Sequence, residues 1–151
     1  MSRGMKIVLW VVGILVVGFI VIQLIPYGRD HDNPPVVNEP TWDSARTEQL
    51  AREACFDCHS NETVWPWYSN IAPASWLLYR DVIEGRENLN FSEWPEDISP
   101  VAAGAIGDAG AELVTSDEMP PLRYRLIHGP ARLSDTEKQE LAAGLRRSLG
   151  Q

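Results

Sequence analysis

The sequence predicts an all-α protein in which one N-terminal transmembrane helix is followed by a small helical domain. Residues 7–25 form an uncharged and almost wholly apolar run. Several later segments repeat apolar residues at the three-to-four-residue spacing of a helix, and no stretch shows the alternation or turn residues of a β-hairpin. We therefore divide the 151 residues into a transmembrane anchor (1–25), a proline-rich linker (26–40) and one domain (41–151).

The apolar run is long enough to cross a bilayer once. At about 1.5 Å per residue its helix would measure roughly 28 Å, close to the hydrocarbon thickness of about 30 Å. A cleaved signal peptide is the alternative, but its cleavage site usually contains alanine, and no alanine precedes Ala45. Arg3 and Lys6 precede the run, so we expect a retained anchor with a cytoplasmic N-terminus and a periplasmic or otherwise extracytoplasmic domain.

The linker, residues 26–40, contains four prolines and no helical periodicity. In polyproline-like geometry it could span up to roughly 45 Å, so we expect a tether that lets the domain swing. His31 lies in this stretch, and we interpret it as a solvated linker residue.

Four helices are expected in the domain that follows. The first begins after Asp43 as N-cap and leads to a pair of cysteines. The second runs over Pro73–Gly85, with an apolar face and a glycine stop. The third begins at Ser99-Pro100, and the last begins at Ser134-x-x-Glu137, which has the spacing of a capping box.

Both cysteines of the chain lie in the run Cys55-Phe56-Asp57-Cys58-His59. The C-x-x-C-H spacing is typical of c-type haem attachment, because two thiols on one helical turn can each bond a haem vinyl group. The histidine that follows then supplies an imidazole to the iron. A lone disulfide and a thioredoxin-like C-x-x-C motif are the alternatives, although the second is expected in a βαβ context that this sequence lacks. We therefore expect one covalent haem c.

Few residues could supply the sixth ligand of the haem iron. Met119 is the one methionine beyond the anchor, and prolines follow it directly, which restricts the freedom of its loop. We interpret Met119 as the axial partner of His59. The alternatives are His128, an open or water-bound iron, and a methionine that merely fills a gap in the core.

Aromatic residues crowd the run Trp65-Pro66-Trp67-Tyr68, which we expect to be irregular. Trp65, Trp67 and Tyr68 could line a haem pocket and bond a propionate through an indole N–H or the phenol. They could equally be plain core residues.

A C-x-x-C-H motif near the start of the domain, with a methionine sixty residues later, resembles class I cytochrome c. More closely, two runs resemble a bacterial family of haem-binding domain proteins, which are small and often membrane-anchored. These runs are CFDCHSNETVWPWYSNIAPASWLLYRDVIEGRENLNFSEW and EMPPLRYRLIHGPARLS. The resemblance covers about Trp42 to Leu145. It implies a cytochrome c-like fold, haem attachment through Cys55 and Cys58, and axial roles for His59 and Met119.

The function expected from these residues is electron transfer by a membrane-anchored monohaem cytochrome c, with no catalytic residue. Beyond the anchor the chain has 11 basic and 21 acidic side chains, which excludes duplex DNA and anionic lipid as direct partners. The acidic surface could guide the domain to a basic redox partner or into a respiratory complex. The alternative is a haem peroxidase, or a gas or redox sensor, with a displaceable sixth ligand.

Overall fold

The computed structural model describes residues 2–150, and its regular structure is helical. The elements are α1 (Arg3–Ile22), α2 (Ala45–Ala54), α3 (Phe56–His59), the 3₁₀ helix η1 (Trp67–Asn70), α4 (Ala74–Asn88), α5 (Pro100–Thr115), α6 (Leu122–Ile127) and α7 (Asp135–Leu149). Within residues 2–150 the one β-type pairing is an isolated bridge between Asn38 and Glu93. The all-α prediction is therefore confirmed.

The chain forms two compact units. The first combines the residues up to Asp32 with Trp65–Ile83, and the second combines Asn33–Val64 with the chain from Glu84 onward. Helix α1 and η1 belong to the first unit, and α4 contributes residues to both. The C-x-x-C-H motif, α5, α6 and α7 all belong to the second.

Helix α1 begins earlier and ends earlier than the predicted run. The Ser2 side chain caps it by accepting a hydrogen bond from the backbone N–H of Met5, and Gln23 follows its last residue. Its apolar side chains are exposed along the whole helix. Within the described part of the chain it is the one helix long and apolar enough to cross a membrane.

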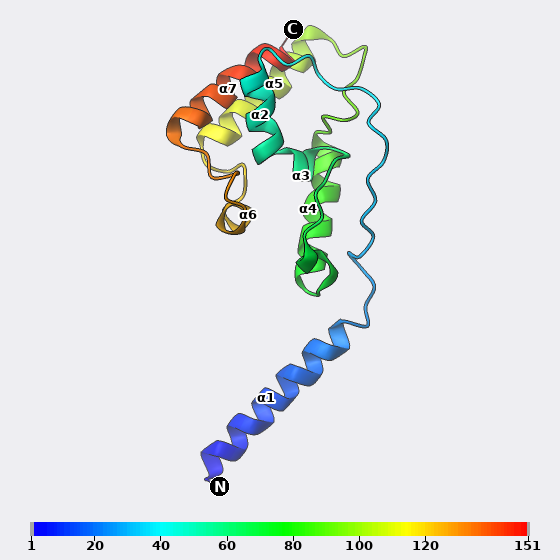
Figure 1. Ribbon diagram of the computed structural model, residues 1–151, viewed down its shortest axis with the longest axis vertical. Helices are drawn as coiled ribbons and strands as arrows, with labels where there is room; N and C mark the ends of the chain where they lie inside the picture. Colours follow the sequence, from blue (N-terminus) through cyan, green and yellow to red (C-terminus); the bar gives the residue numbers. More distant parts are fainter. Residues whose placement is uncertain (1, 151) are drawn as a thin grey trace. The chain divides into compact units, whose positions relative to one another are not determined.

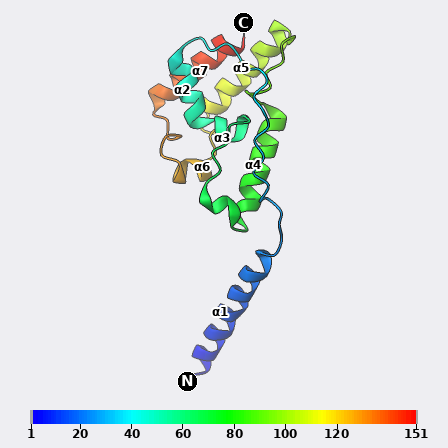
Figure 2. The same ribbon diagram turned by 45° about the vertical axis from the view of Figure 1, so that its right-hand side comes forward.

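The second unit is built on helices α2, α5 and α7, which lie side by side in Figures 1 and 2. Small residues allow the close contacts. A Cβ on Gly144 of α7 would overlap the side chain of Thr47 in α2, and one on Gly107 of α5 would press on the Leu145 carbonyl of α7. The largest core side chains that these helices bury are Leu50, Leu141, Leu145 and Leu149, which pack with Phe56 and Phe91.

The helix boundaries differ from the prediction at two places. Asp43 is not the N-cap of α2, because the Ser44 hydroxyl accepts the hydrogen bond from Thr47 N (3.2 Å), while Asp43 pairs with Arg147 (2.6 Å). Gly85 does not end α4, which continues through it to Asn88. The N-cap Ser99 of α5 and the capping box of α7 are confirmed.

The predicted linker has no helix, but it is not a free spacer in either unit. In the second unit, the backbone N–H groups of Val37 and Asn38 donate to the Ser92 carbonyl (2.9 and 3.2 Å), and Trp94 N donates to the Asn38 carbonyl (3.0 Å). In the first unit, the His31 ring stacks on Trp65 with ring centroids 4.6 Å apart. His31 is therefore partly buried against Trp65 and is not a wholly solvated linker residue.

Candidate functional site

The C-x-x-C-H motif forms a single tight turn at the end of α2. Cys55 N donates to the Ala51 carbonyl (2.8 Å), and the Cys55 carbonyl accepts from both Cys58 N (3.1 Å) and His59 N (2.9 Å). The two cysteines on this turn are not joined by a disulfide, and each residue is partly exposed. The turn thus presents two thiols and one imidazole from five consecutive residues.

The environment of Cys55 disfavours the thiolate. Although part of the residue is accessible, the atoms packed around the thiol raise its pKa to about 12, and the neighbouring Cys58 adds to the effect. Redox C-x-x-C motifs of the thioredoxin type require the opposite, a lowered pKa that supplies a thiolate near pH 7. The geometry therefore counts against the thioredoxin-like alternative.

Phe56 fixes the turn to the core of the second unit. Its ring is buried and stacks on Phe91, with centroids 5.5 Å apart and planes 16° from parallel. The Arg52 guanidinium also lies 4.4 Å from the ring centroid of Phe56, a favourable cation–π distance. Because the first variable position of the motif is anchored in this way, the cysteines on either side of it are held in place.

The half-buried ring of His59 is oriented by the backbone. Its Nδ1 lies 3.0 Å from the Leu89 carbonyl oxygen, just beyond the end of α4. A carbonyl only accepts hydrogen bonds, so Nδ1 carries the proton and Nε2 keeps its lone pair. Burial lowers the pKa of His59, and this outweighs the backbone hydrogen bonds of Leu89 and Gly85, which raise it. The ring is therefore neutral at pH 7, as a metal ligand must be.

Helix α4 approaches the motif closely at Gly85. A Cβ built on Gly85 would overlap the backbone carbonyl of Cys58. Any residue other than glycine at position 85 would therefore force the backbone of α4 away from the backbone of the motif. The same stretch of α4 leads to Leu89, the partner of His59, so the close approach and the histidine hydrogen bond depend on each other.

Asp57, the second variable residue of the motif, accepts hydrogen bonds from three other residues. Its carboxylate accepts from the Tyr124 hydroxyl of α6 (2.6 Å) and from Val64 N (3.0 Å), while its carbonyl accepts from the Thr63 hydroxyl (2.8 Å). Tyr124 lies five residues after Met119. The motif is thereby connected to the segment that carries the predicted sixth ligand.

Met119 lies in the loop between α5 and α6. Its backbone N–H donates to the Leu113 carbonyl (3.0 Å), and its side chain is 37% exposed. Asp117 holds the same loop through Arg125 (2.6 Å) and Lys138 (2.9 Å). Met119 therefore does not fill a gap in the core. Its role as an iron ligand stays a prediction.

His128, the alternative ligand, is engaged with α6. Its ring stacks on Tyr124, with centroids 3.9 Å apart and planes 12° from parallel, and its Nδ1 lies 3.0 Å from the Tyr124 carbonyl oxygen. Tyr124 thus contacts both His128 and Asp57. No sequence pattern marks the contact between Tyr124 and Asp57, because the two residues are 67 positions apart.

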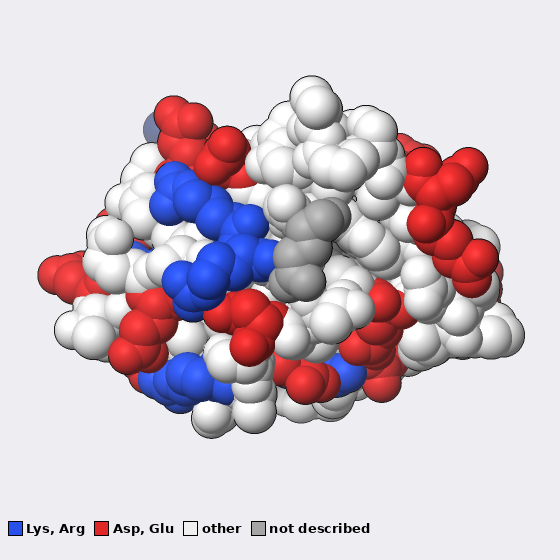
Figure 3. Space-filling view, turned by 90° about the horizontal axis from the view of Figure 1, so that it is seen from above, with Lys and Arg blue, Asp and Glu red and all other residues white. Residues whose placement is uncertain are grey.

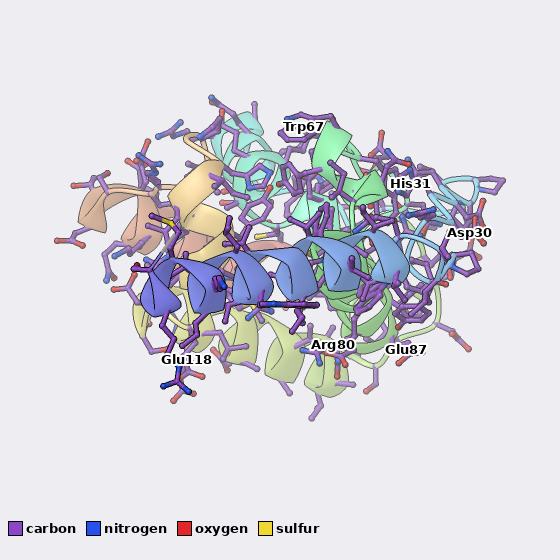
Figure 4. The ribbon with its side chains drawn as sticks, turned by 90° about the horizontal axis from the view of Figure 1, so that it is seen from below. Asp30, His31, Trp67, Arg80, Glu87 and Glu118 are labelled. Carbon is purple, nitrogen blue, oxygen red and sulfur yellow. The ribbon has the colours of Figure 1, made fainter. Side chains whose placement is uncertain are left out.

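The predicted aromatic pocket residues belong to the first unit. Trp65 stacks on His31, and Tyr68 packs edge-on against Trp67 with centroids 5.8 Å apart. Trp67 itself is 77% exposed. Figure 4 shows its side chain at η1. The run is not wholly irregular, since residues 67–70 form η1. Trp67 is not a core residue, and a haem contact for these aromatics stays a prediction.

The donor set fits a haem group. One turn carries two thiols that are not joined to each other, and the adjacent neutral imidazole keeps the lone pair on Nε2. Comparison with curated proteins and with solved structures gives no match. A model of the haem-binding domain family, however, matches residues 17–147, most of the chain including the motif. The chain belongs to the haem-binding domain family.

Proposed function

We propose that this haem protein is a membrane-anchored cytochrome c that carries electrons and uses one covalently attached haem. The observation that carries the proposal is the turn Cys55–His59, where both thiols are separate and the His59 Nε2 lone pair is available. Cys55 and Cys58 would form thioether bonds to the haem vinyl groups, and His59 would ligate the iron. The bound haem supplies one-electron chemistry.

The chain's own residues supply orientation and access. The Leu89 carbonyl fixes the His59 ring, and Phe56 anchors the turn. Met119 would supply the other protein ligand of the iron, since the residue is partly exposed on a loop held through Asp117. Ligation by histidine and methionine blocks the site to small ligands and raises the reduction potential relative to two histidines.

A membrane location suits the same proposal. Helix α1 has 20 residues, which at about 1.5 Å each match a hydrocarbon layer of about 30 Å. With Arg3 and Lys6 in the cytoplasm, the domain would lie on the outer face of the membrane. That is a compartment in which haem c is attached to its protein.

The charge of the protein supports a protein partner rather than a nucleic acid. Residues 41–151 carry 18 acidic and 10 basic side chains. In the view of Figure 3, acidic side chains surround a smaller basic group. We propose a redox partner with a basic surface, either free or within a respiratory complex, because opposite charges speed the encounter of two proteins.

Spectroscopy of the full-length protein tests the ligation. We expect low-spin iron with an Fe(III)–thioether charge-transfer band and no reaction with CO. Met119→Ala should lose the band and gain CO binding, whereas the control Met5→Ala, in α1, should keep both properties of the wild type. High-spin wild-type iron, or rapid CO binding before mutation, would contradict the carrier and favour a sensor or peroxidase.

A further inference from the structure

Exposed apolar side chains of the first unit extend beyond α1. They lie in the segment directly after the helix and in and around η1. They are Leu24, Ile25 and Tyr27 after the helix, and Trp67 and Ile71 in and next to η1. Trp67 is the most exposed aromatic residue after α1, and it lies more than forty positions from the helix in sequence.

A pair of hydrogen bonds joins these two groups of residues. The Gln23 side chain, at the C-terminal end of α1, donates through Nε2 to the Ala72 carbonyl (2.9 Å). Its Oε1 accepts from Ala72 N (3.0 Å). One amide therefore satisfies both backbone groups of Ala72, which is fully buried. The stretch that runs from η1 to Ala72 is thus attached to the end of α1.

Contacts made by three further residues hold the same arrangement. Gly28 has a positive φ of 74°, and a Cβ there would meet the backbone of Ser75, so the turn after α1 lies against the start of α4. Tyr27 packs edge-on against Tyr79 (5.4 Å). His31 stacks on Trp65, and its Nε2 lies 3.2 Å from the Ser69 carbonyl oxygen of η1.

This attachment sets the depth of η1 if α1 crosses the membrane. Helix α1 fills the hydrocarbon layer, so Gln23 would lie where that layer ends. The polar headgroup region continues for roughly 5–7 Å beyond it. A segment bonded to Gln23 would then begin within this region. Tryptophan and tyrosine are enriched at this depth because their rings are apolar at one end and polar at the other.

We propose that η1 is a second membrane contact, in which Trp67 and Ile71 lie among the headgroups of the bilayer that α1 spans, with phospholipid as the partner. This rests on the proposed anchoring by α1. The contact adds apolar area at the interface and fixes the first unit against the membrane surface. It requires no cluster of basic residues, so a zwitterionic lipid suffices.

Photolabelling of the full-length haem protein in phosphatidylcholine vesicles tests the contact. A trace of phosphatidylcholine carries a diazirine near the glycerol end of one acyl chain, and mass spectrometry locates the adducts. We expect adducts on α1 and on residues 65–73. The peptide around Val101 of α5, which is 84% exposed, is the reference for apolar exposure alone, and it should be labelled at background level.

The variant Gln23→Ala removes the two hydrogen bonds to Ala72. Labelling of residues 65–73 should fall several-fold without vanishing, because the two hydrogen bonds to Ala72 are lost while the contacts of Tyr27, Gly28 and His31 remain. Labelling of α1 and the haem spectrum should not change. Gln49→Ala in α2 is the matched control and should label like the wild type.

Three other labelling results would each contradict the proposed contact in a different way. If α1 is labelled but residues 65–73 label no more than the Val101 peptide, the second contact is overturned and the anchor stands. If Gln23→Ala leaves the labelling of residues 65–73 unchanged, the attachment to α1 does not set their depth and the proposal is overturned. If α1 itself is not labelled, the anchor and the contact both fail.

Discussion

The ring of His59 is held by a backbone group rather than by another side chain. The Leu89 carbonyl that orients Nδ1 follows α4 directly, and Leu89 N in turn donates to the Gly85 carbonyl (2.9 Å). A partner of this kind fixes the tautomer and the direction of a ligating histidine. No single side-chain deletion removes it, so the orientation of His59 depends on the course of α4.

Tyr124 offers a direct test of the connection between the motif and α6. Tyr124→Phe removes the hydrogen bond to the Asp57 carboxylate (2.6 Å) and should lower the free energy of unfolding by about 1–2 kcal/mol. Chemical denaturation of the full-length protein measures this change. Tyr27→Phe is the control, because phenylalanine keeps the ring contact with Tyr79. Equal stability of the Tyr124 variant and the wild type would show that the bond contributes nothing.

At the residue scale, spacing alone identified the candidate ligands but not the groups that orient them. Cys55, Cys58 and His59 are recognisable because the chemistry requires them within one turn. Leu89 acts through its carbonyl, which every residue has, so no sequence pattern marks it. Tyr124 and Asp57 are 67 positions apart in the sequence and meet only in the folded protein. Such distant pairs leave no local sequence pattern.

Helix α4 can pass close to the C-x-x-C-H motif because residue 85 is a glycine. Gly85→Ala should destabilise the protein by about 1–3 kcal/mol, the usual cost of overpacking, because the added methyl group would overlap the Cys58 carbonyl. The fraction of chain that carries haem should fall as well. Thermal unfolding and the ratio of haem absorbance to protein measure the two effects.

Gly104→Ala in α5 is the matched control for that substitution. Both glycines lie inside a helix, but a Cβ on Gly104 meets no atom within 4 Å. Alanine should therefore raise the free energy of unfolding by up to about 1 kcal/mol through its helix propensity. If both variants lose stability equally, the close approach of α4 to the motif is not the cause.

The capping box of α7 gives a pH-dependent prediction. Hydrogen bonds from the Ser134 backbone and hydroxyl, together with Arg46, hold the pKa of Glu137 below its ordinary value of 4.5. A lowered carboxyl pKa contributes stability above the ordinary value, and this is lost as the pH falls through the folded-state pKa. Glu137→Gln keeps the cap but removes the charge, so it should be less stable than the wild type at pH 7.

Denaturant titrations of both proteins over a series of pH values check this prediction. The difference between wild type and Glu137→Gln should shrink as the pH falls below 4.5. A difference that stays the same from neutral to acidic pH would show that the carboxylate charge contributes nothing at this cap.

At the element scale, helix ends with strong local signals were predictable from the sequence. Helix ends that depend on tertiary contacts were not. Ser99-Pro100 and the capping box at Ser134 start helices as expected, because their bonds are local. Gly85 looked like a helix stop, whereas it serves a close contact with Cys58. Helix α6 has only six residues directly after two prolines, too few for a periodic pattern.

The charge of residues 41–151 predicts how the proposed electron transfer depends on salt. With an excess of eight acidic side chains in residues 41–151, a cationic oxidant should be attracted and an anionic one repelled. Raising salt from about 0.01 M to about 1 M shortens the screening length from about 30 Å to about 3 Å. Stopped-flow rates should fall for a cationic complex and rise for ferricyanide; identical salt dependence for both would contradict steering.

A covalent bond between this chain and one haem is the proposal on which the other functional proposals depend. Mass spectrometry of the denatured full-length protein, after extraction with acidified organic solvent, tests it directly. We expect haem to stay with the wild-type chain, one per molecule, and the double variant Cys55→Ser with Cys58→Ser to release it. Haem that leaves the denatured wild-type protein for the organic phase would contradict the thioether bonds and the cytochrome c assignment.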